Sequence, residues 1–256
     1  MTVGKLAALA LLCGCAPLCL AAAVSVSGQV AHPGTVALQP EARLLDVLTA
    51  SQPDAQGYWL GAAWLHQPLL ERQTRLKAGV LFDLDTLRRV ALAAGHEGRA
   101  RVATQLYEQV QALPVTGRRL TPLDPVAVEV GFAPNPSISA GDRLVYPPRP
   151  DYVRVLGAVA TACTLAFQPM QRAGDYLRAC PPGPQADADY LWLIQPDGHV
   201  TRLGNAPWNR EEGAPPAPGS TLLVPIRSDD LDPPTPELNQ QLAEFIATQP
   251  LAEITP

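Results

Sequence analysis

The side chains that most often perform catalysis or bind metals are few in this sequence, and their spacing matches no catalytic or metal-binding motif. The four histidines are scattered, at His32, His66, His96 and His199. The sequence has no His-Glu-x-x-His, no Gly-x-Ser-x-Gly and no phosphate-binding glycine loop. We therefore expect no catalytic residue, no metal site and no cofactor.

Paired carboxylates are the other chemistry to look for, because a glycosidase needs two of them on either side of a sugar bond. The chain has 24 aspartates and glutamates, none in a context that sets it apart. Asp142 and Asp197 each lie beside a glycine, where aspartate is favoured because it bonds the turn backbone. We interpret both as turn residues.

Carbohydrate-binding sites favour aromatic platforms, and the candidates here are four tryptophans: Trp59, Trp64, Trp192 and Trp208. We expect Trp59 and Trp64 to pack a helical segment. Trp208 and Asn209 fall in a loop between two expected strands, either as a lid or as an anchor of that loop. They are therefore candidate ligand-binding residues.

Arg118 and Arg119 follow Gly117 where a helical stretch gives way to a strand. A guanidinium offers five donors in a planar fork that suits the carboxylate or phosphate of an acidic glycan. We expect one of the two arginines to line a groove, and the sequence leaves open which one.

Residues 1–23 have the pattern of an export signal. Lys5 precedes a short apolar stretch, and Ala21, Ala22 and Ala23 form a small-residue cleavage site. We expect cleavage there, leading to the periplasm, rather than processing as a lipoprotein at the loose lipobox Leu12-Cys13-Gly14-Cys15.

Export also determines how the cysteines are interpreted. Three of the five lie in the signal, which leaves Cys163 and Cys180. An even count in an oxidising compartment predicts a disulfide, the alternative being two buried free thiols.

Loss of Lys5 with the signal leaves 18 basic against 24 acidic residues, a net charge of −6. This negative charge disfavours nucleic acid and anionic membranes as partners.

A duplication organises the rest of the chain. Residues 24–48 recur at 153–177, 129 positions later, with 12 of 25 positions identical. Each copy closes with a similar phrase, GDRLVYP at 141–147 and GSTLLVP at 219–225. Two copies with so long a period indicate a duplicated domain rather than a repeat array.

Each copy has the pattern of an α+β unit. Alternating residues 24–30 predict a strand, a turn and a second strand follow, and Pro40 begins a helix. Further strands are expected at 126–130, at 190–195 and at 199–203, and an edge strand in GDRLVYP. This order is that of two tandem β-grasp domains.

Residues from about 51 to 116 have no counterpart in the second copy. Two apolar stripes at helical spacing predict a helical insertion that packs on the first repeat; they contain Leu84, Leu87, Val90 and Ala91, and Val102, Leu106, Val110 and Leu113. The predicted domains are thus 24–150, which contains the insertion, and 151–228.

Residues 229–256 predict a proline-rich linker and an amphipathic helix capped by Thr235. One face carries Leu238, Leu242, Phe245 and Ile246. A helix this short is marginal alone in water, so we expect the face to dock on its own chain, a second copy or another protein.

Several phrases in order resemble the GfcC-like capsule biosynthesis proteins: the repeated V-x-V-x-G-x-V, GYWLGAAWL, PVTGRRLTPLDP, GDRLVYPPRPDYV, YLWLIQPDGHV and Trp208-Asn209. The resemblance implies two SLBB-like β-grasp domains similar to those of Wza-type outer-membrane export proteins. It also implies a periplasmic protein without catalytic activity and a deep cleft with an arginine, which maps onto Arg118.

We therefore expect a non-enzymatic periplasmic accessory of capsule or exopolysaccharide export, which binds glycan or an outer-membrane export protein. The alternatives are a lyase or hydrolase that acts on the exported polymer, and a purely structural subunit recruited through the terminal helix. An Arg118→Ala variant is expected to fold normally yet fail to complement.

Overall fold

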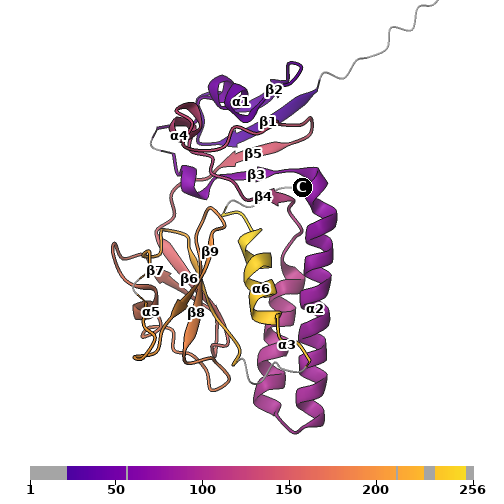
Figure 1. Ribbon diagram of the computed structural model, residues 1–256, viewed down its shortest axis with the longest axis vertical. Coiled ribbons are helices and arrows are strands. Elements are labelled where there is room, and N and C mark those ends of the chain that lie inside the picture. The colour runs from indigo at the N-terminus through magenta and orange to yellow at the C-terminus, as the bar shows by residue number, and fades with distance from the viewer. Residues whose placement is uncertain (1–21, 56, 212, 228–233, 252–256) are drawn as a thin grey trace, which may run out of the picture.

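A computed structural model describes residues 22–55, 57–211, 213–227 and 234–251. Nearly all of the predicted export signal, and most of the proline-rich linker, lie outside these residues. Two five-stranded sheets lie at the two ends of the described part, and a long pair of helices runs from the first sheet along the second (Figure 1).

The first sheet has the strand order β2-β1-β5-β3-β4. β1 and β5 run parallel and the other neighbours antiparallel. Its core contains Val24, Val26, Leu44 and Leu144, beneath two helices. The elements are β1 (Ala23–Gly28), β2 (Gly34–Ala37), α1 (Leu44–Ser51), β3 (Ala63–Leu65), β4 (Arg118–Arg119), α4 (Pro125–Glu129) and β5 (Arg143–Tyr146).

The second sheet repeats this plan, with the order β7-β6-β10-β8-β9. β6 and β10 run parallel, and the other pairs run antiparallel as in the first sheet. The tandem α+β fold predicted from the sequence is confirmed. The elements are β6 (Tyr152–Gly157), β7 (Cys163–Ala166), α5 (Ala173–Tyr176), β8 (Tyr190–Ile194), β9 (Val200–Gly204) and β10 (Thr221–Val224).

Backbone geometry shows why the repeated phrase is similar in both copies. Gly28 and Gly157, 129 positions apart, both have positive φ, of 90° and 110°. A Cβ on Gly28 would lie 1.9 Å from the Tyr146 carbonyl oxygen, and one on Gly157 would lie 2.0 Å from that of Val224. Only glycine fits where the first strand of each copy passes so close to the last one.

Some predicted elements differ from the structure. Residues 126–130 form most of α4 and its end rather than a strand, because Asp124 Oδ1 accepts a bond from the Val126 amide at 3.0 Å and Pro125 begins the helix. The strand in GDRLVYP is central rather than at an edge. The first repeat's helix begins at Leu44, not at Pro40.

The helical insertion is a hairpin of α2 (Leu70–Ala93) and α3 (Glu97–Ala112). It lies between β3 and β4, where the second domain has only the short turn between β8 and β9. The segment before it, predicted as helical, holds a 3₁₀ turn (Trp59–Gly61) and β3.

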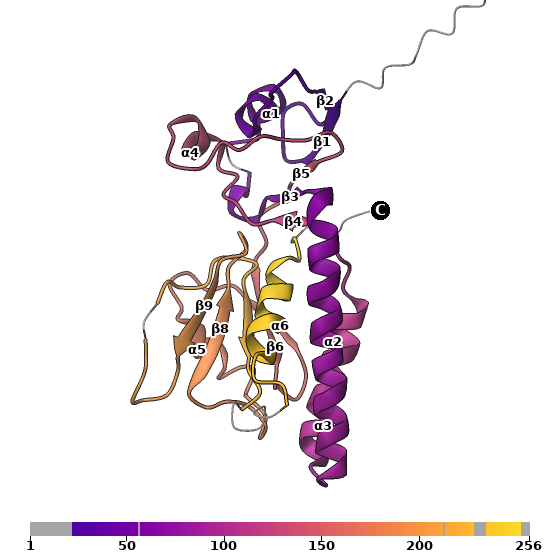
Figure 2. The ribbon, with the colours of Figure 1, turned by 45° about the vertical axis from the view of Figure 1, so that its right-hand side comes forward.

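The sequence predicted that the apolar face of the hairpin packs on the first repeat, but in the structure it packs on the second sheet. Leu84 and Leu106 belong to the same core as Val155 and Leu222 of the second sheet. Figure 2 shows the two helices alongside the second domain, with a third helix next to them. The reason is the length of the helices. A hairpin this long extends past the first sheet and buries its apolar face against the second sheet.

That third helix is α6 (Leu238–Ala247), which begins after Glu237 rather than at Thr235. It contacts α2, β8 and β9. Its apolar face, Leu238, Leu242, Phe245 and Ile246, is buried. Of the three partners considered, its own chain covers this face. The four side chains are therefore not displayed for docking on another protein.

Tyr58 links the first domain to the second, because its hydroxyl donates to the Pro218 carbonyl at 2.6 Å. Burial raises the pKa of Tyr58 to about 12, with Arg149 opposing the rise and Asp197 adding to it. A tyrosine in an unfolded chain titrates near pH 10. The unfolded state therefore loses this proton first, and the stability that Tyr58 contributes is present below pH 10 and lost as the pH rises toward 12.

We expect the difference in unfolding free energy between the wild type and Tyr58→Phe to shrink above about pH 10. Urea titrations of both proteins from about pH 8 to about pH 12 measure it. A difference that stays constant over this range would contradict the assignment.

Candidate functional site

A cleft of about 560 Å³ opens where the helical hairpin leaves the first sheet and meets β9 and α6. Its polar lining comes from three parts of the chain that are far apart in sequence: the start of α2, β4 with its flanks, and the end of α6. The polar residues are His66, Arg72, Gln73, Arg118, Arg119, Glu244 and Thr248.

Arg118 reaches this cleft but is only 3% exposed. Its Nη1 donates to the carbonyl oxygens of Ala247 at 3.3 Å and Gln249 at 3.1 Å. Its Nη2 donates to those of Ala62 at 3.2 Å and Pro196 at 2.5 Å. One guanidinium thus joins the first sheet, the β8–β9 turn and the end of α6, an arrangement that we call the Arg118 clamp.

The backbone around Arg118 is held equally firmly. Gln73 on α2 bonds both the Gly117 amide, at 2.7 Å, and the Arg118 carbonyl, at 2.8 Å. Thr116 Oγ1 donates to the Thr248 carbonyl at 2.8 Å. Gly117 has φ of 70°, and a Cβ there would lie 2.8 Å from the His66 carbonyl oxygen. Glycine is therefore required before Arg118, because any side chain at this position would collide with the His66 backbone.

These contacts give Arg118 a structural role that the prediction of a ligand-binding arginine did not include. Burial lowers the pKa of its guanidinium to about 10, against the opposing effect of Asp197, so Arg118 stays charged at neutral pH. Its terminal nitrogens already donate to main-chain oxygens. Arg118 therefore holds the walls of the cleft together with both of its terminal nitrogens.

Arg119 is the accessible arginine of the pair. It is half-buried in the lining of the cleft, and its guanidinium lies 4.7 Å from the centre of the Trp64 ring. Trp64 was predicted to pack the helical segment, but it is fully buried in the core of the first sheet. The flat ring fixes the guanidinium by a cation–π contact, so Arg119 and the exposed Arg72 are the cleft's available cations.

His66 and Asp142 form a pair beside the cleft that sequence reasoning did not anticipate. His66 Nδ1 lies 2.8 Å from Asp142 Oδ1, and Asp142 is almost fully buried. Asp142 also holds its turn as predicted, because Oδ2 accepts from the Ser139 amide at 2.9 Å.

The duplicated domain preserves this pair with different residues. Sheet register equates Trp64 with Leu193 and Leu144 with Leu222, which places Gln195 at the position of His66 and Ser220 at that of Asp142. Ser220 Oγ donates to Gln195 Oε1 at 2.7 Å. The sequence carried one signal for this pair: aligning GDRLVYP with GSTLLVP sets Asp142 against Ser220, so both copies have a side chain there that can form a hydrogen bond.

Trp208 and Asn209 lie at the end of β9 away from the cleft, since Val200 lines the cleft and Gly204 is at the other end of that strand. Asn209 anchors its loop: Oδ1 accepts from the Ala206 amide and Nδ2 donates to the Asp189 carbonyl, both at 3.0 Å. The structure therefore does not bring the four predicted ligand residues together.

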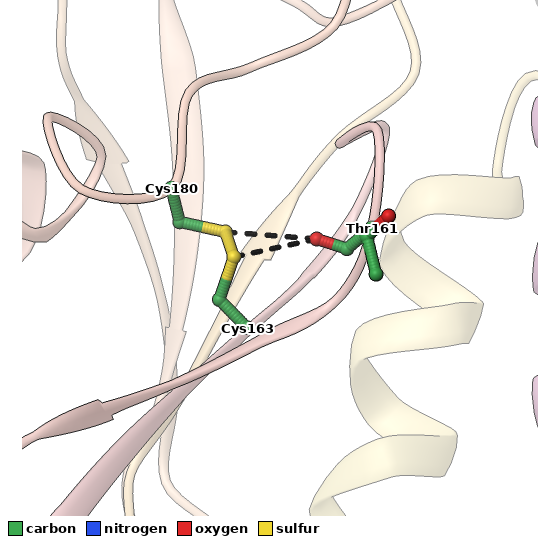
Figure 3. The surroundings of a disulfide bond; sticks show 3 residues. All are labelled: Thr161, Cys163 and Cys180. Atoms are coloured by element: carbon green, nitrogen blue, oxygen red, sulfur yellow. Dashed lines mark hydrogen bonds between the residues drawn. A yellow bond between two sulfur atoms is a disulfide. The ribbon is translucent and has the colours of Figure 1, made fainter.

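Cys163 and Cys180 are joined in a disulfide, as predicted, with a Cα–Cα distance of 6.2 Å. Figure 3 shows the Thr161 carbonyl oxygen facing both sulfurs, at 3.3 Å from Cys163 Sγ and 3.8 Å from Cys180 Sγ. The bond ties β7 to the segment that follows α5.

Within the described parts of the chain, no group of three or more histidine, cysteine, aspartate or glutamate side chains is placed to hold a metal ion. Among the same residues, no helix has both the length and the apolar character that a membrane span requires.

Comparison with known protein families shows which family the chain belongs to. Residues 21–149 match the family described as capsule biosynthesis GfcC, N-terminal, and residues 161–250 match its C-terminal counterpart. The chain belongs to the GfcC family of capsule biosynthesis proteins. The resemblance inferred from the repeated phrases is confirmed, and membership indicates a role in capsule biosynthesis.

One curated relative of this GfcC family member is the uncharacterized protein YjbG of Escherichia coli (strain K12). The two are 31% identical over 148 residues, which cover 57% of this chain and 60% of YjbG. The chain thus matches about three fifths of the length of that relative.

Proposed function

We propose that this protein is a non-enzymatic periplasmic accessory of capsule or exopolysaccharide assembly and export, which binds the polymer or the export machinery through the cleft. The observation that carries the proposal is the cleft itself, with Arg72 and Arg119 as available cations on walls fastened by the Arg118 clamp. Guanidinium groups suit acidic sugars, or acidic side chains of a protein.

The His66–Asp142 pair supports a binding role over catalysis. The second domain keeps the same contact between Gln195 and Ser220, neither of which titrates. A hydrogen bond is present at this place in both copies, which gives the pair a structural explanation that requires no chemical reaction.

Deletion of the gene is expected to abolish surface polysaccharide while synthesis of the repeat unit continues. A gene encoding Arg72→Ala with Arg119→Ala should fail to restore the capsule although the variant accumulates normally. The matched control is Arg202→Ala: Arg202 is exposed, lies 3.6 Å from the centre of the Tyr190 ring and lines none of the pockets described here. Full restoration by the double variant would remove the cleft from the proposal.

A second candidate function, a lyase that acts on the polymer, rests on another property of the same pair, namely that one member lines the cleft. His66 lines the cleft while buried Asp142 orients its ring, as an orienting carboxylate does for a catalytic base. Incubating the purified protein with the native glycan would show a fall in chain length and new unsaturated ends. The loss of this activity in His66→Ala would establish the lyase and overturn the non-enzymatic proposal.

A further inference from the structure

A second cavity, of about 230 Å³, lies in the second domain beside α5. The duplication explains its origin. In the first domain, residues 120–142 connect β4 to β5 and form α4, whose Val128 packs in the core with Leu44 and Leu48 of α1. In the second domain, the equivalent connection is residues 205–220, which is shorter and has no helix in its described residues. The place that apolar side chains fill in one copy is open in the other.

Charged side chains line this opening: Arg172, Arg178 and Arg210 with Asp175 and Glu211. Arg178 Nη2 pairs with Asp175 Oδ1 at 2.5 Å, and Glu211 Oε2 accepts from the Gly204 amide at 3.4 Å. Arg210 is exposed and, among the residues described, has no ion-pair partner. Three cations against two engaged carboxylates leave the cavity with a net positive charge.

The loop that carries Arg210 is held in place. Besides the two Asn209 bonds, Trp208 Nε1 donates to Asp189 Oδ1 at 3.3 Å, which orients an indole that is 70% exposed. The loop also approaches α5 closely, since a Cβ on Gly174 would lie 2.5 Å from Asn205 Oδ1. A loop that is already fixed loses little conformational entropy when it binds a ligand. Because Trp208 is mostly exposed, packing in the core does not explain why a tryptophan is present at this position.

We propose that the second domain binds a carboxylate-bearing sugar at this cavity, which we call the Arg210 site. Arg210 and Arg178 contact the carboxylate, since guanidinium and carboxylate form paired charge-assisted bonds. Trp208 lies outside the lining of the cavity but on the same loop as Arg210, so its exposed ring stacks on the C–H face of a neighbouring sugar ring of the same glycan. The inference rests on the proposed function only in taking the ligand to be a glycan.

The test uses the full chain and a tetrasaccharide that contains glucuronate, with its carboxyl-reduced neutral form as the matched probe. Calorimetry should show that the wild type binds the acidic form at least about tenfold more tightly than the neutral one. Arg210→Ala and Trp208→Ala should each weaken binding about tenfold, whereas Arg202→Ala should not change it. Trp208→Ala should also remove most of the fluorescence change on binding.

Equal affinity for the two tetrasaccharides, no binding at all, or unchanged affinity in Arg210→Ala would overturn the Arg210 site. The combined Arg72→Ala and Arg119→Ala variant distinguishes the two proposals. If binding is lost in that variant and kept in Arg210→Ala, the acidic sugar binds in the cleft that Arg72 and Arg119 line. The proposed function then stands and this inference fails.

Discussion

Replacing Arg118 with alanine should destabilise the fold by about 3–5 kcal/mol, because each buried polar group left without a partner costs about 1–3 kcal/mol and the cost of burying the guanidinium charge is recovered in part. The substitution leaves four main-chain oxygens, those of Ala62, Pro196, Ala247 and Gln249, without the donor that now satisfies them. The loss follows because buried carbonyl groups that lack a partner keep their full desolvation cost.

The neighbouring residue supplies the control for this prediction. Arg119→Ala removes an accessible cation–π contact with Trp64 and is expected to cost about 1 kcal/mol or less. Unfolding in urea measures both variants, and native-state hydrogen exchange should show the Arg118→Ala loss concentrated at the end of α6. A loss below about 1 kcal/mol for Arg118→Ala would show that the clamp contributes little.

The prediction also changes how complementation is interpreted. From the sequence, Arg118→Ala was expected to fold normally and fail for want of a ligand contact. In the structure the side chain binds its own chain, so failure to complement is expected to follow from reduced stability and lower periplasmic levels. Only variants at accessible residues, such as Arg72 and Arg119, test ligand binding directly.

Removing the disulfide is expected to cost about 3 kcal/mol, the chain-entropy value for the 17-residue separation of Cys163 and Cys180. The bond matters here because the second domain's α5 has only four residues, where α1 of the first has eight. The duplication equates the cysteines with Gly34 and Ser51, so the first copy has no crosslink there. We infer that the bond replaces stability that the longer helix supplies in the first copy.

The combined Cys163→Ser and Cys180→Ser variant tests this without leaving a free thiol. Its unfolding midpoint in urea should fall, and dithiothreitol should lower the wild type to a similar value while leaving the variant unchanged. Hydrogen exchange should increase in β7 and α5 and stay the same in β2 and α1. Equal midpoints for the oxidised wild type and the variant would refute a stabilising role.

Local sequence patterns and the internal repetition were enough to predict strands, two similar domains and the disulfide. Alternating residues placed β1 and β6, because side chains of a strand point to opposite faces in turn. The 129-residue echo identified two like domains, because glycines with positive φ and core positions recur where the same backbone recurs. The disulfide followed from the cysteine count and the predicted export signal.

The tertiary structure alone decided which surfaces meet. The apolar stripe of α6 was legible, but its cover is α2 and the second sheet, and no periodicity specifies the identity of a distant partner. Arg118 had the composition of a binding residue, and only the approach of three separate segments made it a structural clamp. The physical reason is that burial and donor pairing are properties of contacts between residues far apart in the chain, whereas strand and helix patterns depend on neighbours.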